Sequence, residues 1–127
     1  MDILVDSWSW LNLLEDQNDP CYRKTIKFLD NSDNSLYTTI LNIYEVYYRA
    51  IDRIGDEAAT EFIVSIKDRA KVVFIDEALA MSAAKIHKTE KLSSIDAFGY
   101  AAAMNLGAQL LTGDPDFKGK KNVIFID

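Results

Sequence analysis

The stretch Ser93–Phe117, SSIDAFGYAAAMNLGAQLLTGDPDF, decides the fold of this chain. It reads as a helix capped by Ser93, then a short apolar strand and a polar turn. A helix that leads into a buried strand is half of a βαβ unit, which predicts a parallel sheet. Asp96 stands in the first turn of the helix, and Asp114 and Asp116 follow the strand directly. Open parallel sheets bind ligands at the carboxyl ends of their strands, so these acids are candidates for a metal site.

The rest of the chain alternates in the same way between short apolar runs and longer amphipathic segments. Two helices fit between each pair among the first four strands, with breaks at Asp19-Pro20 and Gly55. The order β α α β α α β α α β β predicts an α/β fold with a mostly parallel sheet and helices on both faces. Buried strands are expected at residues 3–5, 36–38, 72–75, 108–112 and 123–126. The residues expected to cap helices are Ser7, Thr38 or Thr39, Asp76 and Ser93.

Length and composition favour one cytoplasmic domain. The 127 residues suit a single domain covering 1–127, and a hydrophobic share of 49% supports a real core. No apolar run approaches the roughly 20 residues of a membrane span. The start, MDILVDSW, lacks the basic region of a signal peptide. Cys21 is the only cysteine, so no internal disulfide is possible and a reducing compartment fits.

The charge balance argues against generic affinity for nucleic acids. The chain has a net charge of −6, whereas such affinity usually comes from an excess of Lys and Arg. If five of the acids belonged to one metal cluster, the remainder would be about −1, and bound divalent cations would reverse the local field. The alternative, without any metal cluster, is an acidic protein whose charged residues lie on a solvated surface.

Carboxylates follow or approach several strand ends. Asp6 comes directly after the first strand, and Glu45 lies in the helix after the second. Together with Asp96, Asp114 and Asp116 they can converge at one edge of a parallel sheet. Such a gathering requires positive compensation, because like charges raise each other's pKa. Oxygen ligands without His or Cys suit Mg²⁺ or Mn²⁺, and an acid cluster holding these ions suits phosphodiester hydrolysis.

Each acid also has a purely structural explanation. Asp6 could serve as a helix cap, Asp96 as the third member of a capping box, and Asp114 and Asp116 as turn residues. Glu45 is harder to explain in this way, because a carboxylate on a mostly apolar helix is costly unless it is paired or metal-bound. The alternative for Glu45 is a solvent-facing polar stripe shared with Asn42, Arg49 and Asp52.

Four pieces of the chain together resemble the PIN domain, a metal-dependent ribonuclease fold. They are Ile3–Ser7, the helix from Thr38 to Glu45, Ser94–Ala97 leading into an alanine run, and Leu110–Phe117. The resemblance covers essentially the whole chain, and the last piece is the most specific. Length and single-domain form resemble the toxin component of VapBC-type toxin–antitoxin pairs.

The resemblance implies a three-layer α/β/α sandwich and cleavage of RNA with Mg²⁺ or Mn²⁺. It also implies a small antitoxin as partner, and the apolar helix that carries Glu45 makes a homodimer plausible. The residues that the resemblance assigns to the site are Asp6, Glu45, Asp96 and Asp114 as catalytic metal ligands, Asp116 as a fifth ligand, and Ser7 and Thr112 as supporting hydroxyls.

Other functions remain open from the sequence. A PIN domain could process RNA without an antitoxin, or the fold could be a non-catalytic binding module. A phosphatase with an aspartyl nucleophile is disfavoured, because Trp8 stands where a second Asp is usual. The cluster Lys118, Lys120 and Lys121 is either a solvated loop or a set of phosphate contacts.

Overall fold

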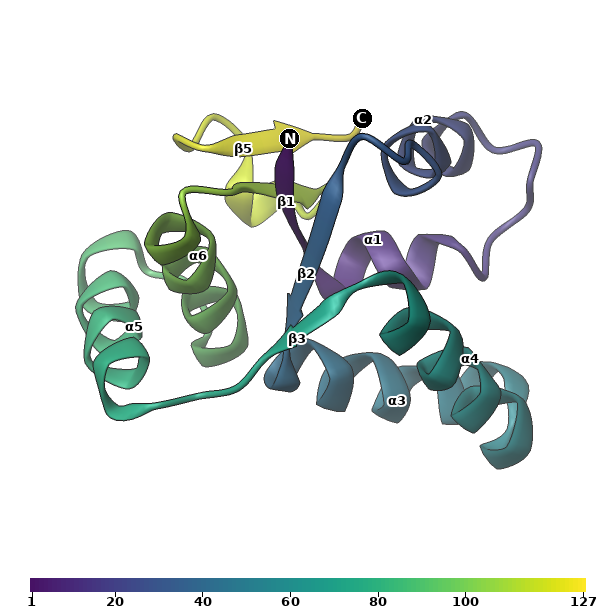
Figure 1. Ribbon diagram of the computed structural model, residues 1–127, viewed down its shortest axis with the longest axis horizontal. Helices are drawn as coiled ribbons and strands as arrows, with labels where there is room; N and C mark the ends of the chain where they lie inside the picture. Colours follow the sequence, from purple (N-terminus) through teal and green to yellow (C-terminus); the bar gives the residue numbers. More distant parts are fainter.

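The computed structural model describes residues 1–127 and confirms the α/β fold with a central parallel sheet (Figure 1). The strand order is β3-β2-β1-β4-β5, and every neighbouring pair is parallel. This order places β1 at the centre and brings β4, which comes late in the chain, directly beside it. The strands are β1 (Asp2–Val5), β2 (Ser35–Thr39), β3 (Lys71–Val73), β4 (Gln109–Thr112) and β5 (Val123–Phe125).

Helices cover both faces of the sheet, as the predicted three-layer sandwich requires (Figure 1). Helices α1 to α4 lie on one side and the packed pair α5 and α6 on the other. The helices are α1 (Ser7–Asn12), α2 (Pro20–Leu29), α3 (Ile40–Ile54), α4 (Asp56–Arg69), α5 (Glu77–Glu90) and α6 (Ser94–Leu106), and a short 3₁₀ turn covers Pro115–Phe117. No helix has both the length and the apolar character needed to cross a membrane.

The two faces of β1 supply two separate cores. Ile3 and Val5 belong to the cluster under α1 to α4, whereas Leu4 belongs to the cluster under α5 and α6. All three side chains are fully buried. This explains why β1 reads as a continuous apolar run without alternation, since a central parallel strand is covered on both sides.

Local capping chemistry sets most helix starts where the sequence predicts them. The side chains of Asp19, Thr39, Asp76 and Ser93 each accept a backbone N–H at the start of their helix. Ser7 is the exception: α1 begins at Ser7 itself, and its hydroxyl accepts a hydrogen bond from the Asn42 amide at 2.9 Å. Ser7 therefore connects α1 to α3 and caps nothing.

The predicted buried strand at residues 72–75 is wrong at its second half. The strand β3 ends at Val73, while Phe74 is 71% exposed and Ile75 is 36% exposed. Because β3 lies at the edge of the sheet, it has a partner on one side only, and the chain leaves the sheet to reach α5 on the opposite face. An apolar run alone does not reveal that its strand lies at an edge.

Candidate active site

The pairing of β1 with β4 brings the acid after one strand beside the hydroxyl at the end of the other. Val5 pairs with Leu111, so Asp6 and Thr112 lie next to each other at the carboxyl edge of the sheet. The Thr112 hydroxyl donates to Asp6 Oδ2 at 2.8 Å, and the Asp6 amide donates to the Leu111 carbonyl at 3.1 Å. Asp6 stands at the N-cap position of α1, but its side chain makes no capping bond. The Asp6 carboxylate is thus held by Thr112 and does not cap α1.

The loop after β4 turns sharply to place two more carboxylates at the same edge. The Asp114 amide donates to the Thr112 hydroxyl at 3.0 Å, and the Asp116 amide donates to Asp114 Oδ1 at 2.9 Å. Gly113 makes the turn possible, because a Cβ there would lie 2.4 Å from the Trp8 ring. Thr112 therefore links the backbone of the loop to the carboxylate of Asp6.

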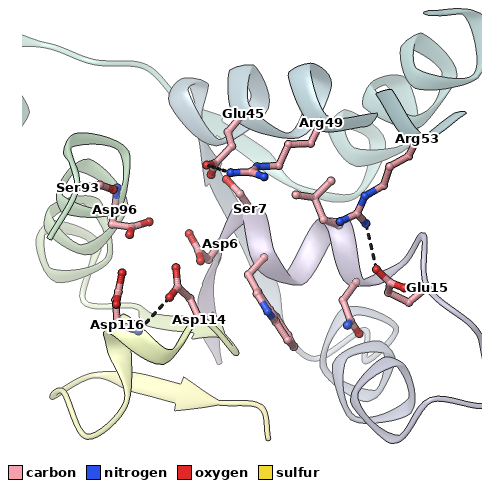
Figure 2. Close-up of a pocket in the computed structure, with 13 residues that line it drawn as sticks. Asp6, Ser7, Glu15, Glu45, Arg49, Arg53, Ser93, Asp96, Asp114 and Asp116 are labelled. Atoms are coloured by element: carbon pink, nitrogen blue, oxygen red, sulfur yellow. Dashed lines mark hydrogen bonds and ion pairs between the residues drawn. The ribbon is translucent and has the colours of Figure 1, made fainter. Parts of the chain in front are cut away.

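Three carboxylates form the centre of the site (Figure 2). One oxygen from each of Asp6, Asp96 and Asp114 lies within 4.8 Å of the others. Glu45 and Asp116 line the same pocket but lie outside this close group. The five predicted acids are thus gathered in one place, with three at its centre and two at its rim.

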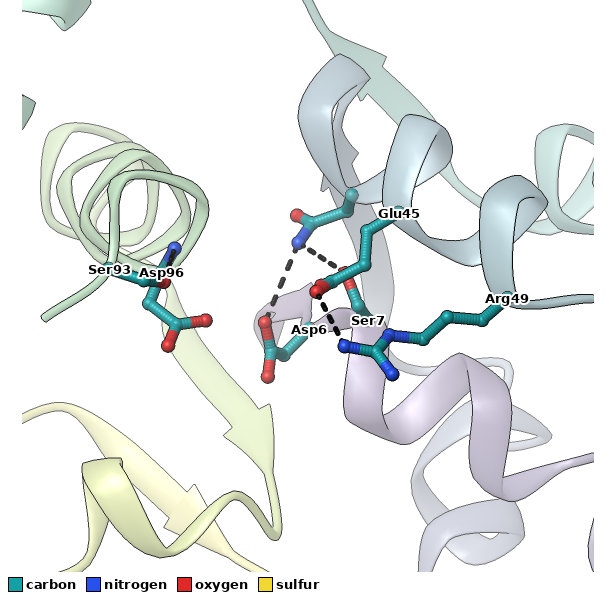
Figure 3. A network of polar contacts seen from close by, with 7 residues as sticks. Asp6, Ser7, Glu45, Arg49, Ser93 and Asp96 are labelled. Atoms are coloured by element: carbon teal, nitrogen blue, oxygen red, sulfur yellow. Dashed lines mark hydrogen bonds and ion pairs between the residues drawn. The ribbon is translucent and has the colours of Figure 1, made fainter.

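A buried amide supports Asp6 from the side of α3. The Asn42 side chain is fully buried and donates to Ser7 Oγ at 2.9 Å and to Asp6 Oδ1 at 3.5 Å. Its oxygen accepts from the amide and the hydroxyl of Thr39, at 3.1 and 2.8 Å, so the cap of α3 fixes its orientation. Figure 3 shows the polar network around Asp6 and Glu45. The idea that Asn42 lies on a solvent-facing stripe is therefore wrong.

Burial and mutual repulsion raise the pKa values of Asp6 and Asp96. Burial is the largest cause that raises the pKa of Asp6, to about 7, and the charges of Asp96 and Glu45 add to it against the lowering effect of the Thr112 hydrogen bond. Burial and then the charge of Asp114 raise the pKa of Asp96 to about 6. Carboxylates held together at this cost favour a bound cation, which lowers the energy of their ionised forms.

The donor set fits a hard divalent cation. All the converging side chains offer oxygen, and no His or Cys lines the pocket. Mg²⁺ and Mn²⁺ prefer such ligands, whereas zinc usually takes nitrogen or sulfur as well. An acidic cluster of the predicted kind is therefore present, with a donor set that would suit such an ion.

The pocket around the acids has a volume of about 510 Å³ and is strongly polar. Trp8 and Leu11 are its two hydrophobic residues, and two arginines of α3, Arg49 and Arg53, also line it. Arg49 pairs with Glu45 at 3.6 Å, and Arg53 pairs with Glu15 at 3.1 Å. Glu45 is thus both a site acid and the partner of a cation on its own helix.

Sequence reasoning missed Asn42, Arg49 and Arg53 as members of the site. The two arginines follow Glu45 at intervals of four residues, and that spacing on a helix was a readable signal. Asn42 carried a weaker signal, as the residue three positions after a capping threonine.

Comparison with known proteins identifies the family of this chain. The family model described as PIN domain matches residues 3–122. The chain belongs to the PIN domain family. A comparison with curated proteins finds no match.

Solved PIN-like structures share the fold over nearly the whole chain at low sequence identity. VapC20 of Mycobacterium tuberculosis, a toxin that cleaves the sarcin–ricin loop, has a TM-score of 0.78 at 18% identity, covering 94% of this chain and 95% of its own. A toxin–antitoxin complex from Klebsiella pneumoniae has a TM-score of 0.78 at 17% identity, covering 98% of both chains. VapBC-1 from nontypeable Haemophilus influenzae has a TM-score of 0.73 at 18% identity, covering 100% of this chain and 98% of its own.

Proposed function

We propose that this PIN domain protein is a metal-dependent endoribonuclease, acting as a single domain over residues 1–127. The observation that carries the proposal is the convergence of Asp6, Asp96 and Asp114 within 4.8 Å at the carboxyl edge of the sheet. Membership of the PIN domain family supports it, as does the fold shared with a toxin that cleaves the sarcin–ricin loop.

In the proposed mechanism, Asp6, Asp96 and Asp114 would hold Mg²⁺ or Mn²⁺, and Glu45 and Asp116 would complete the site from the rim. A bound ion of this kind activates water and stabilises charge on the phosphoryl group. The chain's own residues fix the carboxylates in place. Thr112 and Asn42 hold the two oxygens of Asp6, and the cap by Ser93 sets the first turn of α6, from which Asp96 projects.

The test replaces Asp96 and Asp114 separately with asparagine, which keeps shape and removes charge. Each variant should lose at least about 100-fold in Mn²⁺-dependent cleavage of RNA and should bind Mn²⁺ more weakly by calorimetry. Asp68→Asn, an exposed acid of α4 outside the pocket, is the matched control and should change neither. Full activity in Asp96→Asn would contradict the assignment, and absence of Mn²⁺ binding in the unaltered protein would favour a non-catalytic module.

We further propose that the protein is the toxin of a cytoplasmic toxin–antitoxin pair and forms a homodimer. The fold shared with the Klebsiella pneumoniae complex supports the antitoxin. Tyr44 and Tyr48 of α3 are 61% and 63% exposed, which supports an interface there. Expression should arrest growth unless a small neighbouring gene product is supplied, and ultracentrifugation should give twice the monomer mass. Growth that continues without such a product would favour an RNA-processing nuclease.

A further inference from the structure

The pocket holds two kinds of charge, and they are separated in space. The acids Asp6, Asp96, Asp114 and Asp116 lie toward one end (Figure 2). Arg49 projects from α3 beside Glu45, and Arg53 lies farther from these acids, beside Glu15. These arginines are the only basic residues that line the pocket, although the chain contains 14 Lys and Arg. Arg49 pairs with Glu45 on the same helix, and Arg53 pairs with Glu15, which follows α1.

The arginines form a line on α3 that starts at Glu45, on the rim of the site. Glu45, Arg49 and Arg53 are spaced four residues apart on α3, so they share one side of the helix. At a rise of about 1.5 Å per residue, each step along this line covers roughly 6 Å. The line from Glu45 to Arg53 is therefore roughly 12 Å long, and the two arginines are roughly 6 Å apart along the helix axis. Each arginine can thus contact a different phosphate of the same strand.

The present partners of the arginines hold them weakly. The side chains of Arg49 and Arg53 are 56% and 44% exposed, and their partners Glu45 and Glu15 are 24% and 51% exposed. Exposed ion pairs contribute little to stability, so exchanging a carboxylate for a phosphate costs little. A guanidinium group also binds phosphate through two parallel hydrogen bonds, which makes the exchange favourable.

The other basic candidates lie elsewhere. None of Lys118, Lys120 and Lys121 lines the pocket. Lys120 pairs with Glu90 at 3.5 Å, and the Lys118 ammonium lies 5.9 Å from the centre of the Phe125 ring. A net charge of −6 repels a nucleic-acid backbone over most of the surface, so local cations are needed where the strand enters. The polar lining of the pocket suits a charged backbone better than the apolar face of a peptide helix.

We propose that Arg49 and Arg53 bind consecutive stretches of the phosphate backbone of single-stranded RNA and guide it along α3 into the acid centre. This inference rests on the proposed function and names the part of the site that holds the substrate. The arginines are positioning residues: they bind phosphates beside the reacting one and take no part in the chemical step.

The test measures RNA binding without relying on cleavage. A fluorescent single-stranded RNA of about 12 nucleotides is titrated with protein in Ca²⁺ at about 50 and 200 mM NaCl, and a gel checks that the RNA stays intact. Arg49→Gln and Arg53→Gln should each weaken binding about tenfold at the lower salt. Each should also reduce the slope of log affinity against log salt by about 0.7, the value for one phosphate contact on a single strand.

The chain offers a matched control in Arg69, which is 38% exposed and pairs with Asp30 at 3.3 Å outside the pocket. Arg69→Gln makes the same charge change and should leave the affinity and the salt slope unaltered. Arg49→Lys and Arg53→Lys should keep the salt slope of the unaltered protein but only part of its affinity. Lysine keeps the positive charge but cannot donate the two parallel hydrogen bonds of a guanidinium group. Thermal melting by circular dichroism verifies that each variant is folded.

The result that overturns the inference is a double glutamine variant whose salt slope equals that of the unaltered protein and of Arg69→Gln. It is also overturned if the double variant keeps RNA binding and loses a protein partner, since the arginines would then serve a protein interface. Failure of the proposed function gives a different result. If RNA binding depends on the arginines but cleavage does not depend on Asp96, the inference holds and the proposed nuclease activity is contradicted. If cleavage depends on Asp96 but RNA binding does not depend on the arginines, the proposed function holds and the inference is overturned.

Discussion

Replacing Asp6 with asparagine should stabilise the metal-free protein, although Asp6 lies at the centre of the candidate site. The pKa of Asp6 is about 7 in the folded protein, compared with an ordinary value of 3.8. Between these two values the folded chain holds a proton that the unfolded chain has released. The free energy of unfolding therefore falls as the pH rises from about 4 to about 7, and the loss is complete above that range.

The size of the effect follows from the pKa difference. A rise from 3.8 to about 7, at roughly 1.4 kcal/mol per pKa unit, gives about 4 kcal/mol at about pH 8. An asparagine oxygen can still accept from Thr112, but its amide group would face the amide of Asn42, and this lost contact lowers the gain. Asp6→Asn should therefore raise the free energy of unfolding by about 2 to 4 kcal/mol at about pH 8.

The assay is urea unfolding followed by circular dichroism, with EDTA present, at about pH 4 and about pH 8. The gain should be present at the higher pH and vanish at the lower, where Asp6 is protonated in the folded state. Mn²⁺ at about 1,000 times its Kd should cancel or reverse the difference, because it then stabilises the unaltered protein by about 4.1 kcal/mol and the variant has lost a ligand. An equal gain at both pH values, or none at about pH 8, would refute the electrostatic reasoning.

Two further substitutions test the supports of the site. Gly113→Ala places a methyl group 2.4 Å from the Trp8 ring, so it should lower the free energy of unfolding by about 1 to 3 kcal/mol and weaken Mn²⁺ binding in calorimetry. Gly99→Ala, whose added Cβ meets its nearest atoms at 3.9 Å, is the control and should show neither effect. Asn42→Ala removes the amide donor to Asp6 and should lower Mn²⁺ affinity about 10- to 100-fold, whereas an unchanged affinity would restrict this residue to a structural role.

Much of the fold could be predicted because its signals are local. Caps such as Thr39, Asp76 and Ser93 bond backbone groups within three residues of themselves, so the sequence alone contains both partners. The alternation of strands and helices then predicts a parallel sheet, and a parallel sheet brings strand ends together. Asp6 and Asp114 could be placed in one site by that argument alone.

The missed features depend on contacts between distant segments. Phe74 was predicted as buried because nothing in its neighbourhood shows that β3 lies at the sheet edge. Asn42 reads as a polar residue on an amphipathic helix until α1 is packed against α3 and Ser7 reaches its amide. The pairing of Arg53 with Glu15, across 38 positions, likewise has no local signature.

The hydrogen bond between Thr112 and Asp6 joins residues 106 positions apart, and this separation determines when the site can exist during synthesis. β1 leaves the ribosome long before β4, the strand that completes its carboxyl edge. Closing so long a loop is slow and entropically costly. Asp6 therefore lacks its contact with Thr112 while the residues between them are translated. A nascent chain therefore has no assembled cluster of Asp6, Asp96 and Asp114 until β4 and the loop after it have been made.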